Sequence, residues 1–209
     1  MELNLVESFQ KDSSAKVLVL SNLITIVLAV AFSWNIIIIL WSFWLQSIII
    51  GFFNFFRILT LKDYSTENFK INSMPVTASS SIKIFVGLFF AFHYGFFHLI
   101  YAVFLGVFTF ASGSITSGDI FYIGLAGLIF FFNHLFSFLY FKNKPKKQQN
   151  IGAIMFYPYA RIIPMHLTII FGGIFLFSGI GSAFVLVFFL LLKTGADLVM
   201  HFIEHKEQL

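Results

Sequence analysis

The chain has 209 residues, of which 59% are hydrophobic and 11% are charged, and it contains no cysteine. Soluble domains carry about 25% charged residues, so this composition predicts an integral membrane protein, and the lack of cysteine excludes disulfides, thiolate metal sites and cysteine nucleophiles. The net charge of +4 is small, and the basic residues fall mainly in the predicted loops, which favours membrane lipids over nucleic acid as partners.

Six apolar runs follow a polar N-terminal segment, residues 1–15, in which we expect no cleavable signal peptide. Apolar runs of about 20 residues cross the ~30 Å hydrocarbon core of a bilayer as helices. The runs are continuous and do not alternate, so strands are not expected in them. The sequence therefore predicts an all-α fold, a polytopic transmembrane helical bundle of six spans in residues 16–205, followed by a tail at 206–209. The predicted spans are residues 16–33, 35–59, 82–110, 120–141, 159–178 and 181–205.

The predicted loops differ sharply in charge. The first, third and fifth loops contain no lysine or arginine, and the first and fifth are tight turns at residues 33–35 and 179–181. With six spans, both basic loops lie on one side together with both termini. The positive-inside rule then predicts a multi-pass protein of the cell inner membrane with both termini in the cytoplasm. The basic residues of the second and fourth loops are Arg57, Lys62, Lys70, Lys83, Lys142, Lys144, Lys146 and Lys147.

The last predicted span carries ionisable residues every four positions, namely Lys193, Asp197, His201 and His205. On a helix this spacing produces one slowly drifting stripe. A charge at the centre of a bilayer costs roughly 2.5 to 3.5 kcal/mol on insertion scales. The stripe therefore predicts that other spans supply counter-groups or that it faces a wet cavity.

Polar residues from four spans share one depth in the cytoplasmic half of the predicted bundle. Counting in from the basic loops at about 1.5 Å per residue places them about 6 to 15 Å from that side. Arg161 has the same depth as Asp197 across the turn at residues 179–181, so we expect these two charges to pair. Gln46 is expected to hydrogen bond to another helix, and His98, which lies further out, to serve packing. The predicted shared site consists of His93, His134, His166, Asp197 and His201.

Three chemistries fit such a site. Histidine and aspartate ligands suit zinc or another divalent metal, supplied here by the five residues just named. The same groups suit a proton relay, and two opposed histidines could hold haem, the less favoured cofactor. The leading interpretation is a zinc-type membrane hydrolase, with Asp197 as ligand or base and Arg161 and Lys193 holding negative charge. A small proton-coupled transporter and a structural membrane subunit are the alternatives.

Several short motifs can be compared with known families. They are His93-Tyr94-Gly95-x-Phe97, Pro158-Tyr159-x-Arg161, Lys193-x-x-x-Asp197-x-x-x-His201 and the segment at residues 41–46. Together they resemble a bacterial and archaeal family of six-span membrane proteins known as a domain of unknown function. The resemblance implies the six-span fold and its topology, and it implies no activity. Three positions depart from the family pattern, with Phe43 in place of tyrosine, Gln46 in place of glutamate and Tyr101 in place of a second histidine.

Overall fold

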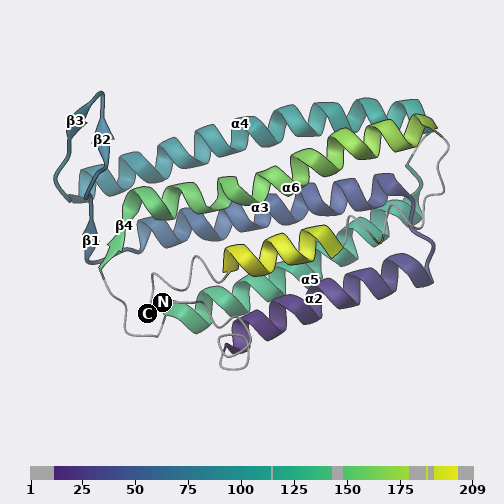
Figure 1. The fold of residues 1–209 in the computed structure, drawn as a ribbon, viewed down its shortest axis with the longest axis horizontal. Coiled ribbons are helices and arrows are strands. Elements are labelled where there is room, and N and C mark those ends of the chain that lie inside the picture. The colour runs from purple at the N-terminus through teal and green to yellow at the C-terminus, as the bar shows by residue number, and fades with distance from the viewer. Residues whose placement is uncertain (1–11, 114, 143–147, 179–186, 188–190, 202–209) are drawn as a thin grey trace.

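The computed structural model describes residues 12–113, 115–142, 148–178, 187 and 191–201. Within those residues the chain is mostly helical. A helical stretch without a label, residues 191–201, follows the last labelled helix (Figure 1). The labelled helices are α2 (Ser13–Ala31), α3 (Ile36–Leu59), α4 (Ser80–Ser112), α5 (Ser117–Lys142) and α6 (Ile151–Ser178).

Polar side chains mark where the first three of these helices begin. The Asp12 carboxylate accepts hydrogen bonds from the backbone N–H groups of Ser14 and Ala15, at 2.8 and 3.3 Å. Asn35 caps α3 in the same way, through a 3.0 Å bond from the N–H of residue 38, and Ser79 caps α4. Such caps satisfy backbone donors that have no partner inside the helix. They explain why the apolar runs start as helices directly after these residues.

Helix α3 lies in the middle of the bundle (Figure 1). It contacts α4, α5 and α6, while α2 lies against α5 and α4 lies against α6. Two clusters of buried apolar side chains meet on it. One joins α3 to α4 and α6 and includes Ile58 and Phe90, and the other joins α3 to α2 and α5 and includes Phe43 and Phe130. Because α3 is packed on both sides, polar groups that it carries must find protein partners.

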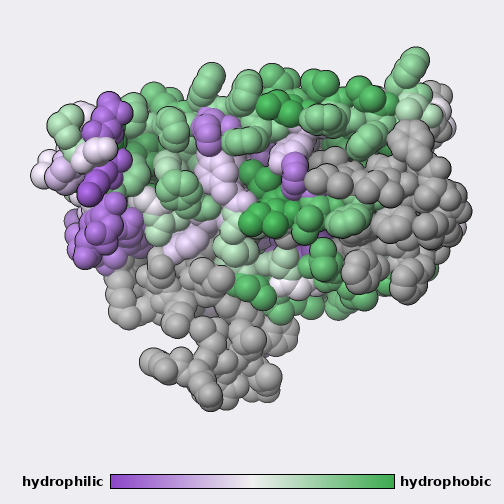
Figure 2. Space-filling view, turned by 45° about the horizontal axis from the view of Figure 1, so that its top comes forward, coloured by the Kyte–Doolittle hydropathy of each residue, from purple (hydrophilic) through white to green (hydrophobic). Residues whose placement is uncertain are grey.

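The outer helices expose large apolar side chains instead. On α4, Phe92 is 77% exposed and Phe110 is 91% exposed, and Figure 2 shows hydrophobic residues along the sides of the molecule. In the described part of the chain, four helices are long and apolar enough to cross a membrane, namely α2, α3, α4 and α5. An apolar surface of this extent is costly in water, so these helices are compatible with a membrane protein.

Short strands connect the loops at one end of the bundle. Strand β1 (Tyr64–Ser65) pairs in parallel with β4 (Gln149–Asn150). This pairing joins the loop after α3 to the loop before α6. Strands β2 (Lys70–Ile71) and β3 (Met74–Pro75) form an antiparallel pair in the same loop. This end is hydrophilic in Figure 2. The predicted all-α character is confirmed for the described residues, with two-residue strands added between the helices.

The start of α6 differs from the sequence prediction. The helix begins at Ile151, eight residues before the predicted start at residue 159. Asn150 caps it, since its side chain accepts a 3.1 Å bond from the N–H of Ala153. Ile151 and Ile154 are fully buried in its first turns. Pro158 indicates a boundary in the sequence, but the cap and the buried first turns outweigh that signal.

One glycine permits the closest approach between α3 and α4. A Cβ atom added to Gly51 would lie 2.4 and 2.7 Å from two ring carbons of Tyr94. Tyr94 is buried, and its hydroxyl group donates to the backbone oxygen of Ser47 at 2.9 Å. The ring therefore has little freedom to move aside.

We expect Gly51→Ala to lower the free energy of unfolding by about 1–3 kcal/mol, since overpacking of a dense core has that cost. The control is Gly95→Ala on α4, where an added Cβ meets nothing within 4 Å and where alanine favours the helix. Thermal unfolding of the purified protein in detergent measures both variants. If Gly51→Ala were as stable as Gly95→Ala, the close contact with Tyr94 would be disproved.

Candidate functional site

A lysine and a carboxylate pair inside the bundle, on the helical stretch 191–201. The distance from Lys193 Nζ to Asp197 Oδ2 is 2.6 Å, and their side chains are only 9% and 7% exposed. The spacing of four residues places both on one face of the helix. Buried charges of opposite sign stabilise one another only when hydrogen bonds satisfy their remaining donors and acceptors.

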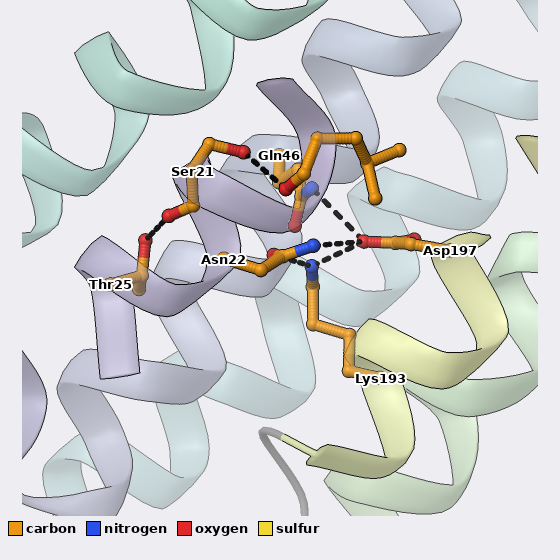
Figure 3. Close-up of polar contacts among 7 residues, drawn as sticks. Ser21, Asn22, Thr25, Gln46, Lys193 and Asp197 are labelled. Atoms are coloured by element: carbon orange, nitrogen blue, oxygen red, sulfur yellow. Dashed lines mark hydrogen bonds and ion pairs between the residues drawn. The ribbon is translucent and has the colours of Figure 1, made fainter. Parts of the chain in front are cut away.

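Two amide side chains from other helices supply those hydrogen bonds (Figure 3). Asn22 of α2 accepts from Lys193 Nζ through Oδ1 at 3.1 Å and donates through Nδ2 to Asp197 Oδ2 at 3.5 Å. Gln46 of α3 donates through Nε2 to the same oxygen at 3.3 Å. An amide oxygen thus faces the positively charged lysine, and amide N–H groups face the negatively charged aspartate. We call these four residues, Asn22, Gln46, Lys193 and Asp197, the ionic cluster.

Two phenyl rings complete the surroundings of the lysine. Its Nζ lies 5.0 Å from the centre of the Phe43 ring and 4.9 Å from that of Phe130. The face of an aromatic ring attracts a cation within about 6 Å, more strongly where water is excluded. The ammonium group is therefore held by a carboxylate, an amide oxygen and two rings, contributed by α2, α3, α5 and residues 191–201.

A contact between a histidine and a carboxylate lies one helical turn further along. His201 Nε2 is 3.0 Å from Asp12 Oδ2, and these side chains are 3% and 16% exposed. Asp12 is also the cap of α2, so one carboxylate both starts a helix and contacts the histidine. The polar stripe of residues 193, 197 and 201 thus leads from the ionic cluster towards the end of the bundle where the strands lie.

A separate polar network occupies the seam between α3 and α4. The Ser47 hydroxyl group is 2.8 Å from the Tyr94 hydroxyl group and 2.8 Å from His98 Nε2. His98 Nδ1 is 2.8 Å from the backbone oxygen of Tyr94. Trp44 Nε1 donates to the backbone oxygen of His98 at 2.8 Å. The expected packing role of His98 agrees with this buried, fully bonded position.

Two further histidines contact tyrosines between α4 and α6. His93 Nδ1 lies 2.8 Å from the Tyr159 hydroxyl group, and His166 Nδ1 lies 3.1 Å from the Tyr101 hydroxyl group. Both histidines belonged to the predicted shared site. Tyr101 is thus a hydrogen-bond partner of His166.

The five residues of the predicted site therefore lie in different surroundings. Asp197 and His201 line one stripe, while His93 and His166 lie in the seam between α4 and α6, and His134 is buried on α5. Within the described part of the chain there is no group of three histidine, cysteine, aspartate or glutamate residues that could hold a metal ion. Binding of zinc, of another divalent metal or of haem stays a prediction.

Two other predicted residues fall outside the part of the chain that can be placed. The Arg161 side chain and all of His205 lie outside the described residues. The predicted pairing of Arg161 with Asp197 stays a prediction for that reason. Within the described residues the cation beside Asp197 is Lys193, which the sequence analysis had assigned to holding negative charge on a substrate.

Sequence reasoning found part of the ionic cluster and missed the rest. The interhelical hydrogen bond expected of Gln46 is confirmed. Asn22 and Asp12 were missed, although both had a signal in the sequence. Asn22 stands with Ser21 and Thr25 as polar residues inside an apolar run, and all three are buried. Asp12 directly precedes such a run, where a helix cap is expected.

The fold and the site together define a helical bundle with apolar, membrane-compatible helices and a charge pair at its centre. The chain belongs to the family of unknown function DUF6498, whose match covers residues 4–209. This match supports the resemblance to a family of unknown function. No curated protein and no solved structure matches the chain.

The ionic cluster predicts strongly non-additive mutant effects. Asp197→Asn or Lys193→Met leaves one buried charge without its partner, and each should reduce the free energy of unfolding by about 3–5 kcal/mol. The double variant Lys193→Met/Asp197→Leu removes both charges, so its loss should be well below the sum of the single losses. Unfolding of the purified protein in mixed detergent micelles gives all three values. Additive losses would mean that the two side chains do not act as a pair.

Proposed function

We propose that this protein is a six-span carrier of the cell inner membrane, with both termini in the cytoplasm, and that it couples transport to proton movement. The ionic cluster is the proton-binding site in this proposal. Among the described residues, the loop between α3 and α4 carries Lys62 and Lys70, and Lys83 lies in the first turn of α4, whereas the turns at residues 32–35 and 115–116 contain no basic residue. This distribution supports the cytoplasmic assignment of the basic end.

The observation that carries the proposal is the burial of a full ion pair where neutral groups would suffice. Asn22 and Gln46 could join their helices through an amide–amide hydrogen bond with no charge present. The chain instead places an ammonium and a carboxylate between them, although desolvating two charges costs several kcal/mol per ion. Ionisable residues retained at membrane depth commonly mark ion pathways and proton relays. A function that uses the charge explains its presence better than packing does.

Protonation would change how the surrounding helices are held. The pair is neutral overall when Lys193 is charged and Asp197 is ionised. A proton added to Asp197 weakens its bonds from Asn22 and Gln46, because a carboxylate accepts hydrogen bonds more strongly than a carboxylic acid. Those two amides belong to α2 and α3, so a single proton alters the contacts between three helical segments. Local charge changes of this kind can shift a protein between two arrangements.

The stripe offers the proton a route to the basic end. His201 lies one turn beyond Asp197, about 6 Å along the helix axis, and contacts Asp12 at 3.0 Å. Histidine and aspartate are the groups found in such relays. The ionic cluster, His201 and Asp12 therefore form a series of titratable groups between the interior and the end of the bundle.

The topology leads to a labelling experiment that the lack of native cysteine makes simple. Met74→Cys lies in the exposed loop at the basic end, and Ser117→Cys lies at the exposed start of α5 at the other end. In intact inside-out vesicles, a membrane-impermeant maleimide should label Met74→Cys and spare Ser117→Cys. Right-side-out cells should give the opposite result. Labelling of both positions from one face would contradict the six-span arrangement.

Proton coupling leads to a transport experiment. Purified protein in liposomes with an internal pH dye should show proton flux under an imposed membrane potential, and Asp197→Asn should reduce that flux to the level of empty liposomes. The matched control is Asp63→Asn, the same carboxylate-to-amide change in an exposed loop, which should keep the wild-type rate. Equal flux through wild type and Asp197→Asn would reject Asp197 as the proton-binding group. A wild-type protein without flux would instead favour the structural subunit.

A further inference from the structure

The surroundings of Lys193 Nζ have the composition of a receptor for a free ammonium ion. An ammonium group has three N–H donors and no acceptor. Here a carboxylate oxygen lies 2.6 Å away and an amide oxygen 3.1 Å away. Two ring faces at 4.9 and 5.0 Å cover the same nitrogen. Lys193 supplies only the nitrogen and a flexible stem, while every group that binds the nitrogen comes from elsewhere.

One acceptor in this region has no donor. Gln46 is 2% exposed, and no described residue hydrogen bonds to its Oε1 atom, although its Nε2 atom binds Asp197. A buried acceptor without a donor costs about 1–3 kcal/mol. This oxygen is therefore an acceptor beside Asp197 that the tethered ammonium group does not use.

We propose that the species coupled to the proton is a small primary ammonium cation, which binds where Lys193 Nζ lies in this structure. This inference rests on the proposed carrier function and names its substrate class. Lys193 is then a tethered occupant that fills the site and keeps the carboxylate neutralised between substrates.

The exchange conserves charge at the site. Lys193 Nζ gives a proton to Asp197 Oδ2, which is in contact, and the proton leaves through His201 of the stripe and through Asp12, the cap of α2. The neutral amine then releases the ionised Asp197 carboxylate, and an incoming ammonium cation takes its place. One positive charge is present before and after, so one proton leaves for each cation bound. Without a cation, the site gives up and regains only the proton, and this is the flux that the membrane potential drives in the liposome experiment above. His134 is the nearest titratable group on α5, one turn beyond Phe130 in the sequence.

The ligand set favours ammonium over a metal cation. Mg²⁺ and Ca²⁺ need six or more oxygen ligands, whereas this site presents a carboxylate, amide groups and two phenyl faces. Ring faces attract ammonium groups and supply no lone pair to a metal. A primary ammonium also directs its N–H groups as the lysine does, which a quaternary ammonium does not.

The first test restores the missing group chemically. Lys193→Ala deletes three methylene groups and the ammonium, which together correspond to n-propylammonium. The full-length variant in detergent should have a lowered melting temperature, and n-propylammonium chloride should raise it again in a saturable way. Tetramethylammonium chloride at equal ionic strength should not. Lys193→Met, whose side chain fills the stem, and Lys193→Ala/Asp197→Asn, which lacks the carboxylate, should show no recovery.

A folded Lys193→Ala protein that n-propylammonium does not stabilise overturns the inference. Where that variant does not fold, the wild-type protein decides, through uptake of radiolabelled methylammonium into liposomes with an acidic interior. Uptake above that of Asp197→Asn supports the inference, and its absence overturns it. Proton flux that ignores methylammonium overturns the ammonium class while keeping the proton carrier. Saturable stabilisation by n-propylammonium without proton flux supports the cation site and overturns the carrier.

Discussion

The structure depends on how an apolar bundle accommodates one ammonium and one carboxylate. Neither charge is tolerated alone at such a depth, so the helices around residues 191–201 must supply complementary groups. Asn22 and Gln46 do so with both ends of their amides, and Phe43 and Phe130 cover the ammonium. The pair therefore specifies which faces of α2, α3 and α5 turn towards the last helical stretch, which apolar contacts alone would leave poorly determined.

Helix α3 links this cluster to the second polar network. Gln46 points to Asp197 on one side, while its neighbour Ser47 contacts Tyr94 and His98 on the other. Adjacent helical residues differ by about 100° around the axis, so one turn of α3 serves two seams of the bundle. A rotation of α3 about its axis would disturb both networks together. Through α3, a protonation change at Asp197 would therefore alter the contacts of α4 as well.

The sequence predicts well how far along the bundle each polar residue lies. It predicts poorly which side of its helix the residue is on. Rise per residue follows directly from the helical spacing, so the stripe of Lys193, Asp197 and His201 could be anticipated. Rotation depends on packing that a single sequence does not contain. His93 and His166 therefore lie in the seam between α4 and α6 and not beside Asp197. Boundaries set by caps were foreseeable in principle, as the Asn150 cap of α6 illustrates.

The decisive difference between a structural and a functional cluster here is charge, not polarity. Amides fix helix contacts without responding to pH, because they do not titrate. The ionic cluster combines two amides with two groups that exchange protons, and it places them on a stripe that continues through His201 to Asp12. For a scaffold, that continuation adds one contact, between His201 and the cap of α2. A carrier requires it, because a proton bound in the interior must also be able to leave.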